Sequence, residues 1–271
     1  MSESGMLTLK ELVSEFRNAG LSPGDSLIVH SSFRSLGPVD GGPETVIDAL
    51  VQAVSPGGNV MFPTFNYTGN IAQPYFDPAV TPCLTGIIPE LARKRPNAVR
   101  SIHPTHSVAV IGPDAIELTK DHLSFRAVGI GSPVDRLAKM GGKVLLLGVP
   151  NTSNTTVHTG EEYAGVPKVG WTETLPYANV LMPDGSIYRH QIDTSTSCSN
   201  AFDAVEYVLR RHGEIHDYRI GQCRLKIMQG QDVINRVIEM IAEKPDILLC
   251  TYPSCRPCTG ARANLRQMGK L

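Results

Sequence analysis

The stretch KVLLLGVPNTSNTTVHTGEE, residues 143–162, joins a run of apolar residues to a polar loop and then to a histidine and two glutamates. The apolar run 143–147 is typical of a buried strand, and the loop after it can cap a helix. If a helix follows, His158 and Glu161 lie three residues apart on one of its faces. Ligands of open α/β sheets bind at the carboxyl ends of the strands, so we expect this pair to address a binding pocket. The alternative is that His158 is an ordinary polar residue near a helix start.

Segments typical of strands and of helices alternate on both sides of this stretch. A capping box, Thr8 with Glu11, predicts a first helix. Further strands are expected at 26–30, 108–111, 220–228 and 247–250, and further helices at 43–54 and 231–243. Pro-Asp-Gly at 183–185 predicts an antiparallel hairpin. The sequence therefore predicts the α/β class, as a single domain over residues 1–271 with a mainly parallel central sheet flanked by helices plus an antiparallel extension.

The bulk composition limits the classes of partner. Of the 271 residues, 25 are Lys or Arg and 26 are Asp or Glu, so the formal net charge is −1. The basic residues are scattered, whereas nucleic-acid binding usually requires clustered positive charge. No apolar run approaches the roughly 18 to 20 residues of a membrane helix, and the N-terminus lacks a signal-peptide pattern. We therefore expect no nucleic-acid partner, no membrane partner and a cytoplasmic location.

The segment SSFRSLGPVDGG, residues 31–42, is rich in small residues and follows the strand expected at 26–30. Small residues let backbone N–H groups approach a ligand, and the helix expected from Pro43 would point its N-terminus the same way. Such an arrangement suits an anion such as a pyrophosphate. A plain surface loop is an equal alternative, because the segment has neither a GxGxxG motif nor a Walker lysine motif.

Two further segments carry polar residues close to strands. Thr64 falls at the carboxyl end of the strand expected after Gly58. Residues 100–107, RSIHPTHS, place an arginine, two histidines and several hydroxyls just before the strand at 108–111. This cluster suits ligand binding or a well-bonded turn. Because His-x2-His without an accompanying acid or cysteine is not a specific metal pattern, we expect no metal cofactor.

Three of the six cysteines stand close together near the C-terminus, as Cys250-x4-Cys255-x2-Cys258. Thiolates at such spacing can share a zinc ion or an iron–sulfur cluster, but both usually need a fourth ligand. The candidates, Cys198 and Cys223, are distant in sequence. Without a signal peptide or a regular spacing, the pattern favours free thiols in a loose C-terminal loop, and a metal site is the alternative.

Seven short motifs run in order along the chain, within a likeness to a known family that extends from about Leu7 to Leu249. They are HSS at 30–32 with LG at 36–37 and GG at 41–42, Met61 with PTF at 63–65, RS at 100–101 with HP at 103–104, GSP at 131–133, LLLGV at 145–149, NT at 154–155 with His158 and Glu161, and CS at 198–199 with Phe202. Each motif is weak by itself, but the ordered set resembles the aminoglycoside 3-N-acetyltransferase family.

The resemblance implies a single α/β domain that uses acetyl-CoA as co-substrate. It implies direct transfer of the acetyl group to the 3-amino group of a 2-deoxystreptamine aminoglycoside, a small-molecule amine, without an acyl-enzyme. It also suggests a homodimer. Some relatives act on other amines or use other acyl-CoA donors, so a different amine acceptor is one alternative. A non-catalytic CoA-binding protein is the other.

The resemblance also implies roles for individual residues. His158 would be the general base, Asp193 the acid that orients it and Thr64 the donor to the oxyanion. Glu161, Glu162 and Asp77 would bind the cationic acceptor, although Asp77 could equally cap a turn. The residues expected at the CoA site are His30, Ser31, Ser32, Ser35, Leu36, Gly37, Val39, Arg100, Ser101, His106 and Ser107.

Overall fold

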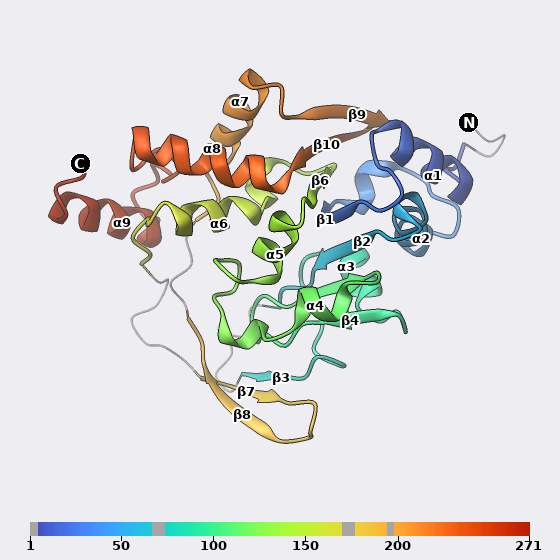
Figure 1. Ribbon diagram of the computed structural model, residues 1–271, viewed down its shortest axis with the longest axis horizontal. Helices are drawn as coiled ribbons and strands as arrows, with labels where there is room; N and C mark the ends of the chain where they lie inside the picture. The colour runs from blue at the N-terminus through green and yellow to red at the C-terminus, as the bar shows by residue number, and fades with distance from the viewer. Residues whose placement is uncertain (1–4, 67–73, 170–176, 194–197) are drawn as a thin grey trace.

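The computed structural model describes residues 5–66, 74–169, 177–193 and 198–271. These residues form one α/β domain with a seven-stranded central sheet and a separate three-stranded sheet (Figure 1). The predicted fold class is confirmed. In the described part of the chain, no helix is long and apolar enough to cross a membrane.

The central sheet has the strand order β4-β5-β2-β1-β6-β10-β9. Its strands are β1 (Ser26–Ser31), β2 (Asn59–Pro63), β4 (Ala98–Arg100), β5 (Val108–Ile111), β6 (Lys143–Leu147), β9 (His216–Ile220) and β10 (Cys223–Gln229). Strand β1 pairs in parallel with β2 on one side and with β6 on the other. The outer strands pair antiparallel, so parallel pairing is confined to the centre. The carboxyl ends of three neighbouring strands therefore meet at one edge.

The second sheet is the predicted antiparallel extension. It contains β3 (Tyr75–Phe76), β7 (Tyr177–Leu181) and β8 (Ile187–Gln191). The Pro-Asp-Gly turn at 183–185 joins β7 to β8, which pair antiparallel as expected. Figure 1 shows this sheet below the central one, on the side of β4.

Helices cover both faces of the central sheet. The helices are α1 (Leu9–Asn18), α2 (Pro43–Val54), α3 (Ile87–Ala92), α4 (Ala115–Thr119), α5 (Pro133–Lys139), α6 (Thr156–Tyr163), α7 (Asp203–Arg211), α8 (Gly230–Glu243) and α9 (Arg256–Gln267), with short 3-10 turns η1 (Phe33–Leu36), η3 (His122–Ser124) and η4 (Asn151–Ser153). Side chains of a strand alternate between faces, so Ile28 of β1 joins one core and its neighbours Leu27 and Val29 join the other. The first core lies against α4 to α9 and the second against α1 to α3.

The C-terminal part of the chain differs from the sequence prediction. Residues 247–250 form no strand: the backbone turns there, with the N–H of Leu249 donating to the carbonyl of Asp246. A short apolar run does not distinguish a strand from a buried turn. The expected loose C-terminal loop is also wrong, because residues 256–267 form α9. The single strand expected at 220–228 is instead the β9–β10 hairpin.

Candidate active site

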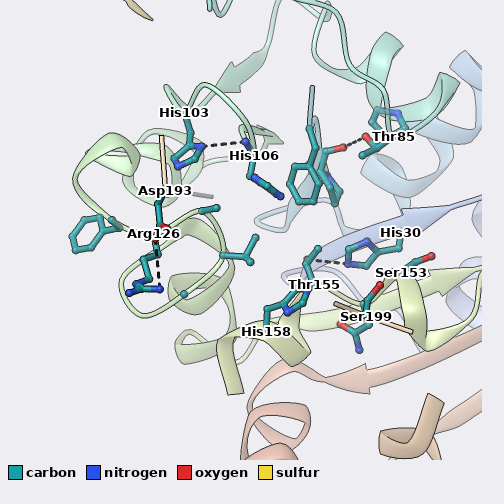
Figure 2. A pocket seen from close by; sticks show the side chains of 18 of the residues that line it. His30, Thr85, His103, His106, Arg126, Ser153, Thr155, His158, Asp193 and Ser199 are labelled. Carbon is teal, nitrogen blue, oxygen red and sulfur yellow. Dashed lines mark hydrogen bonds and ion pairs between the residues drawn. The ribbon is translucent and has the colours of Figure 1, made fainter. Parts of the chain in front are cut away.

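A cavity of about 720 Å³ lies at the carboxyl ends of the parallel strands (Figure 2). Residues from the ends of β1 and β2, the start of α6, the loop after η3, and the end of β8 line it. Its polar lining includes His30, Ser31, Thr85, His103, His106, Ser124, Arg126, Thr152, Ser153, Asn154, Thr155, His158, Lys168, His190, Gln191, Asp193 and Ser199. The small sheet thus closes the cavity from the side opposite α6.

The loop between β6 and α6 is fixed by local chemistry. Gly148 has φ +70°, and a Cβ there would lie 1.9 Å from the Ser35 hydroxyl oxygen, so only glycine fits. Asn154 Oδ1 accepts a hydrogen bond from the Thr156 N–H (3.1 Å) at the start of α6. The sequence 143–162 therefore forms the strand, loop and helix that its pattern predicts.

His158 and Glu161 form a hydrogen-bonded pair within α6. His158 Nδ1 lies 2.8 Å from Glu161 Oε2, and the side chains are 15% and 0% exposed. An ionised carboxylate can only accept, so Nδ1 carries the proton and Nε2 is the nitrogen that can take another. The imidazole packs edge-on against Phe202, with ring centroids 4.6 Å apart. A histidine held in one tautomer and exposed to a cavity can serve as a general base.

The structure gives Glu161 the place at Nδ1 that the sequence analysis assigned to Asp193. The carboxylate of Asp193 lies 3.5 Å from Arg126 Nη1, and its side chain is 46% exposed. Asp193 follows β8 and lines the cavity (Figure 2). The expectation that Glu161 binds the acceptor does not fit its geometry, since its buried side chain bonds the histidine.

Thr64 does not have the geometry of an oxyanion donor. Its side chain is fully buried, and its hydroxyl donates to the Ser107 carbonyl (2.8 Å). The neighbours Pro63 and Phe65 line the cavity, whereas Thr64 does not. Alternation along the extended backbone turns its side chain away from the ligand.

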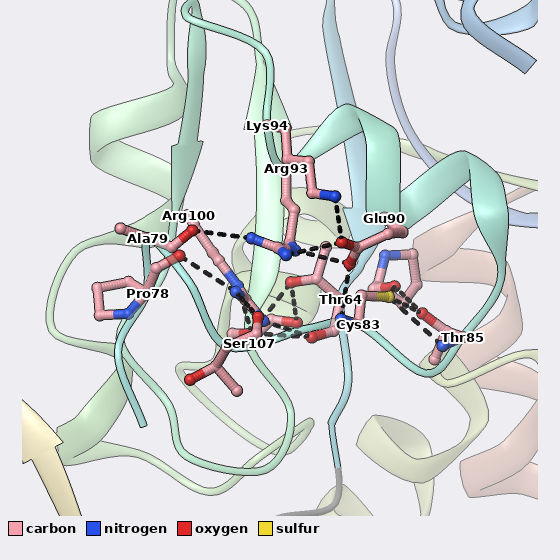
Figure 3. A network of polar contacts seen from close by, with 12 residues as sticks. Thr64, Pro78, Ala79, Cys83, Thr85, Glu90, Arg93, Lys94, Arg100 and Ser107 are labelled. Carbon is pink, nitrogen blue, oxygen red and sulfur yellow. Dashed lines mark hydrogen bonds and ion pairs between the residues drawn. The ribbon is translucent and has the colours of Figure 1, made fainter. Parts of the chain in front are cut away.

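Arg100 and Ser107 form a buried network beside Thr64 instead of a cofactor site (Figure 3). The Arg100 guanidinium donates to Ser107 Oγ (3.0 Å), the Thr64 carbonyl (3.1 Å), and the carbonyls of Pro78 (3.1 Å) and Thr81 (2.6 Å). All these acceptors belong to the protein. The network therefore anchors the chain at 78–81 to β2 and β5.

A second network engages Ser101. Its hydroxyl lies 2.8 Å from His122 Nδ1 and accepts from the Val108 N–H (2.9 Å). Ser101 is buried and does not line the cavity. Neither it nor Arg100 is positioned as the sequence analysis expected for CoA binding.

Only the start of the predicted CoA cradle faces the cavity. His30 and Ser31 line it, and the buried Ser31 hydroxyl has no hydrogen-bond partner among the described residues. The remaining predicted side chains point elsewhere: the Ser35 hydroxyl donates to the Ser32 carbonyl (2.7 Å), and Leu36 and Val39 belong to the core beneath α1 and α2. Gly37 has φ +75° and ends η1. The side chains of Ser35, Leu36 and Val39 thus do not line the cavity.

His106, which was expected at the CoA site, lines the cavity and is one of a group of histidines. His103 packs against His122 with centroids 4.6 Å apart and lies 6.2 Å from His106 and from His190. Burial lowers the pKa of His30 and His106 to about 3 and that of His122 to about 4. The sequence analysis missed His190, because its place beside His103 depends on how the two sheets meet.

Opposite charges are paired at the rim of the cavity. Glu162 accepts from Lys168 Nζ (3.2 Å) and lies 3.8 Å from Arg126 Nε. Lys168 and Arg126 line the cavity, and neither was predicted, since no motif marks an isolated basic residue in a loop. Asp77 instead caps a turn: its Oδ1 accepts from the Ala79 N–H (2.8 Å), and it does not line the cavity.

Comparison with known proteins assigns the chain to a family. A family model described as aminoglycoside 3-N-acetyltransferase matches residues 28–242. Aminoglycoside N(3)-acetyltransferase III of Salmonella sp is 39% identical over 255 residues, which cover 84% of this chain and 89% of that protein.

Solved structures agree with the sequence comparison. The crystal structure of aminoglycoside acetyltransferase AAC(3)-IVa as apoenzyme is 30% identical, with a TM-score of 0.84 over 97% of this chain and 99% of that one. A mutant of AAC(3)-IVa in complex with a gentamicin is also 30% identical, with a TM-score of 0.83 over 97% and 98% of the two chains. The chain therefore belongs to the aminoglycoside 3-N-acetyltransferase family, a family of acyltransferases.

Proposed function

We propose that this protein, as one domain over residues 1–271, transfers the acetyl group of acetyl-CoA to the 3-amino group of a 2-deoxystreptamine aminoglycoside, with His158 as general base. The observation that carries the proposal is the His158–Glu161 pair, 2.8 Å apart, at a cavity of about 720 Å³. Family membership supports the same reaction, and the ligand in the AAC(3)-IVa mutant complex, a gentamicin, is an aminoglycoside.

In the proposed mechanism the acceptor amine attacks the thioester carbonyl directly. Nε2 of His158 takes the proton that the amine loses, and the carboxylate of Glu161 stabilises the imidazolium that forms. The tetrahedral intermediate then collapses and the C–S bond breaks. The leaving sulfur takes the proton from Nε2 of His158, so CoA leaves as its thiol and the imidazole is neutral again. The hydroxyl of Ser31, buried at the cavity without a partner among the described residues, is our candidate donor to the acetyl-CoA carbonyl in place of Thr64.

The other histidines at the cavity are poorer bases. Burial lowers the pKa values of His30, His103, His106 and His190, and neighbouring histidines lower that of His103 further. A group with a depressed pKa gains little by accepting a proton at neutral pH. His158 instead has a buried carboxylate at Nδ1 that can stabilise an imidazolium.

We place the acceptor at the side of the cavity where Arg126 pairs with two carboxylates. Asp193 and Arg126 line the cavity, and both Asp193 and Glu162 contact Arg126. An ammonium group of the acceptor could donate a charge-assisted hydrogen bond to Asp193 beside Arg126. Two cations, Arg126 and Lys168, also line the cavity, and this favours a different amine, one that carries an anionic group, as the second candidate acceptor.

A cytoplasmic location is also part of the proposal. None of the six cysteines forms a disulfide, and this supports a reducing compartment such as the cytoplasm. The homodimer suggested by the resemblance stays a prediction.

The first prediction concerns the reaction itself. Mixing the protein with acetyl-CoA and a panel of 2-deoxystreptamine aminoglycosides should release CoA thiol, followed with a thiol reagent. His158→Ala should lower kcat by about 10²- to 10⁴-fold, because the amine loses its proton acceptor. His216→Ala, on the exposed surface of β9, is the control. Absence of thiol release with every aminoglycoside contradicts the acceptor, and full activity of His158→Ala contradicts the base.

The second prediction separates the roles of the carboxylates. Glu161→Gln should lower kcat by roughly 10²- to 10⁴-fold with little change in KM, because the amide neither fixes the tautomer nor stabilises an imidazolium. Glu117→Gln, on the exposed side of α4, is the matched control. Circular dichroism and thermal unfolding check that the buried substitution folds. A raised KM with an unchanged kcat would return Glu161 to the acceptor-binding role.

The third prediction tests Asp193 as an acceptor ligand. Asp193→Asn should raise the aminoglycoside KM by about tenfold or more, as expected for loss of a charge-assisted hydrogen bond, while kcat changes little. Steady-state kinetics with each substrate varied in turn measure both constants. Asp184→Asn, in the exposed turn between β7 and β8, should leave KM unchanged. A large fall in kcat with an unchanged KM would instead make Asp193 part of the catalytic apparatus.

A further inference from the structure

Four of the six cysteines meet behind the wall of the cavity. Their Sγ atoms lie within 4.8 Å of one another, and all four side chains are buried. Cys198 stands before α7, Cys250 ends the turn after α8, and Cys255 and Cys258 belong to the first turn of α9. The fold thus brings Cys198 to a group 52 residues further along the chain. We call these four residues the cysteine cluster.

The spacing of the sulfurs fits a single metal ion. Zn–S bonds of about 2.3 Å in a tetrahedron place the sulfurs roughly 3.8 Å apart. Cys198 Sγ and Cys250 Sγ lie 3.8 Å apart. A disulfide would need a separation of about 2.05 Å, and the inorganic core of an iron–sulfur cluster would hold its ligands further from one another.

Backbone donors surround the sulfurs as they do in thiolate sites. The N–H of Cys250 donates to Cys258 Sγ (3.3 Å), and the N–H of Asn200 donates to Cys198 Sγ (3.4 Å). A thiolate is a far better acceptor than a thiol, so such bonds stabilise the metal-bound form. Two of the cysteines also begin α9, where the helix dipole favours negative charge.

An arginine fixes the turn that carries Cys250. The guanidinium of Arg262, from α9, donates to the carbonyl of Cys250 (2.7 Å) and the carbonyl of Leu249 (2.5 Å), and bonds Asp246 Oδ2 (3.0 Å). Arg262 therefore fixes the backbone at Cys250, and packing holds the buried cysteine side chains.

We propose that the cysteine cluster binds one zinc ion in a closed, structural site. A tetrahedral set of four sulfur ligands selects zinc over magnesium, calcium or manganese, which prefer oxygen. With no position left for water or substrate, the ion takes no part in the chemistry of the cavity. Zinc binding displaces the protons of the four thiols. Burial raises the pKa of Cys198 and Cys258, and the free energy of zinc binding offsets the cost of removing their protons.

The site links the C-terminal helix to the cavity wall. Cys198 directly precedes Ser199, which lines the cavity, and is followed by Phe202, which packs against the His158 ring. On another side, a Cβ at Gly260 of α9 would lie 2.8 Å from Val169 Cγ1, next to the cavity residue Lys168. One metal ion would thus hold α9 against two segments of the wall.

The fourth prediction tests the site by metal content, independently of the acetyl transfer proposed above. Full-length protein purified without chelators from zinc-replete cells should contain about one zinc ion per chain by plasma mass spectrometry. Cys255→Ser should lose the metal, and so should Cys258→Ser. Cys223→Ser is the control and should keep it, since Cys223 contacts Ser35 and lies outside the cluster.

Two measurements on the unaltered chain cover the case in which the serine variants do not fold. A mercurial thiol reagent should release the zinc to a chromogenic chelator as the thiols react. Cobalt exchanged into the site should show the visible absorption of tetrahedral cobalt thiolate. Zinc at background level, iron in its place, or an intact mass that reveals a disulfide among these cysteines would each overturn the proposal.

Discussion

The architecture of this site depends on one buried carboxylate. Glu161 is fully buried, and a charge removed from water is tolerated only where a donor compensates it. The His158 ring supplies that donor from the same helix. The position of α6 is in turn fixed by close packing, because a Cβ at Gly160 would lie 2.6 Å from Val237 Cβ of α8. The orientation of the proposed base, His158, therefore follows from how α6 packs, and needs no residue from the small sheet.

The two sheets contribute different residues to the cavity. The carboxyl ends of β1, β2 and β6 provide the floor of the cavity, and α6 carries the proposed base. The small sheet brings His190 and Asp193 to the opposite side of the cavity. There the Asp193 carboxylate pairs with the Arg126 guanidinium. The proposed chemistry thus lies beside the central sheet, and the contacts that would select the acceptor come from the loops and the added sheet.

Features set by neighbouring residues could be predicted from the sequence. The capping box of Thr8 and Glu11 forms as expected, and so does the hairpin at Pro183-Asp184-Gly185. The shared helical face of His158 and Glu161 was also evident, because it depends only on helical spacing.

Features set by tertiary structure could not be predicted in the same way. The side on which Thr64 points depends on the register of β2 with β5, and the approach of Cys198 to the C-terminal cysteines depends on how α7, α8 and α9 pack. The same holds for Arg100: its sequence context suits a ligand site, but its partners are carbonyls from a loop about 20 residues earlier. Sequence pattern indicates which residue types can do chemistry; packing decides which of them face the ligand.

The tautomer of His158 tests the central claim most directly. Nitrogen-15 NMR of histidine-labelled protein, at a pH where the imidazole is neutral, distinguishes a proton on Nδ1 from one on Nε2, with Glu161→Gln as the comparison. The structure predicts the Nδ1–H tautomer in the unaltered protein and its partial loss in Glu161→Gln. An Nε2–H tautomer for His158, or a tautomer ratio that Glu161→Gln leaves unchanged, would contradict the account.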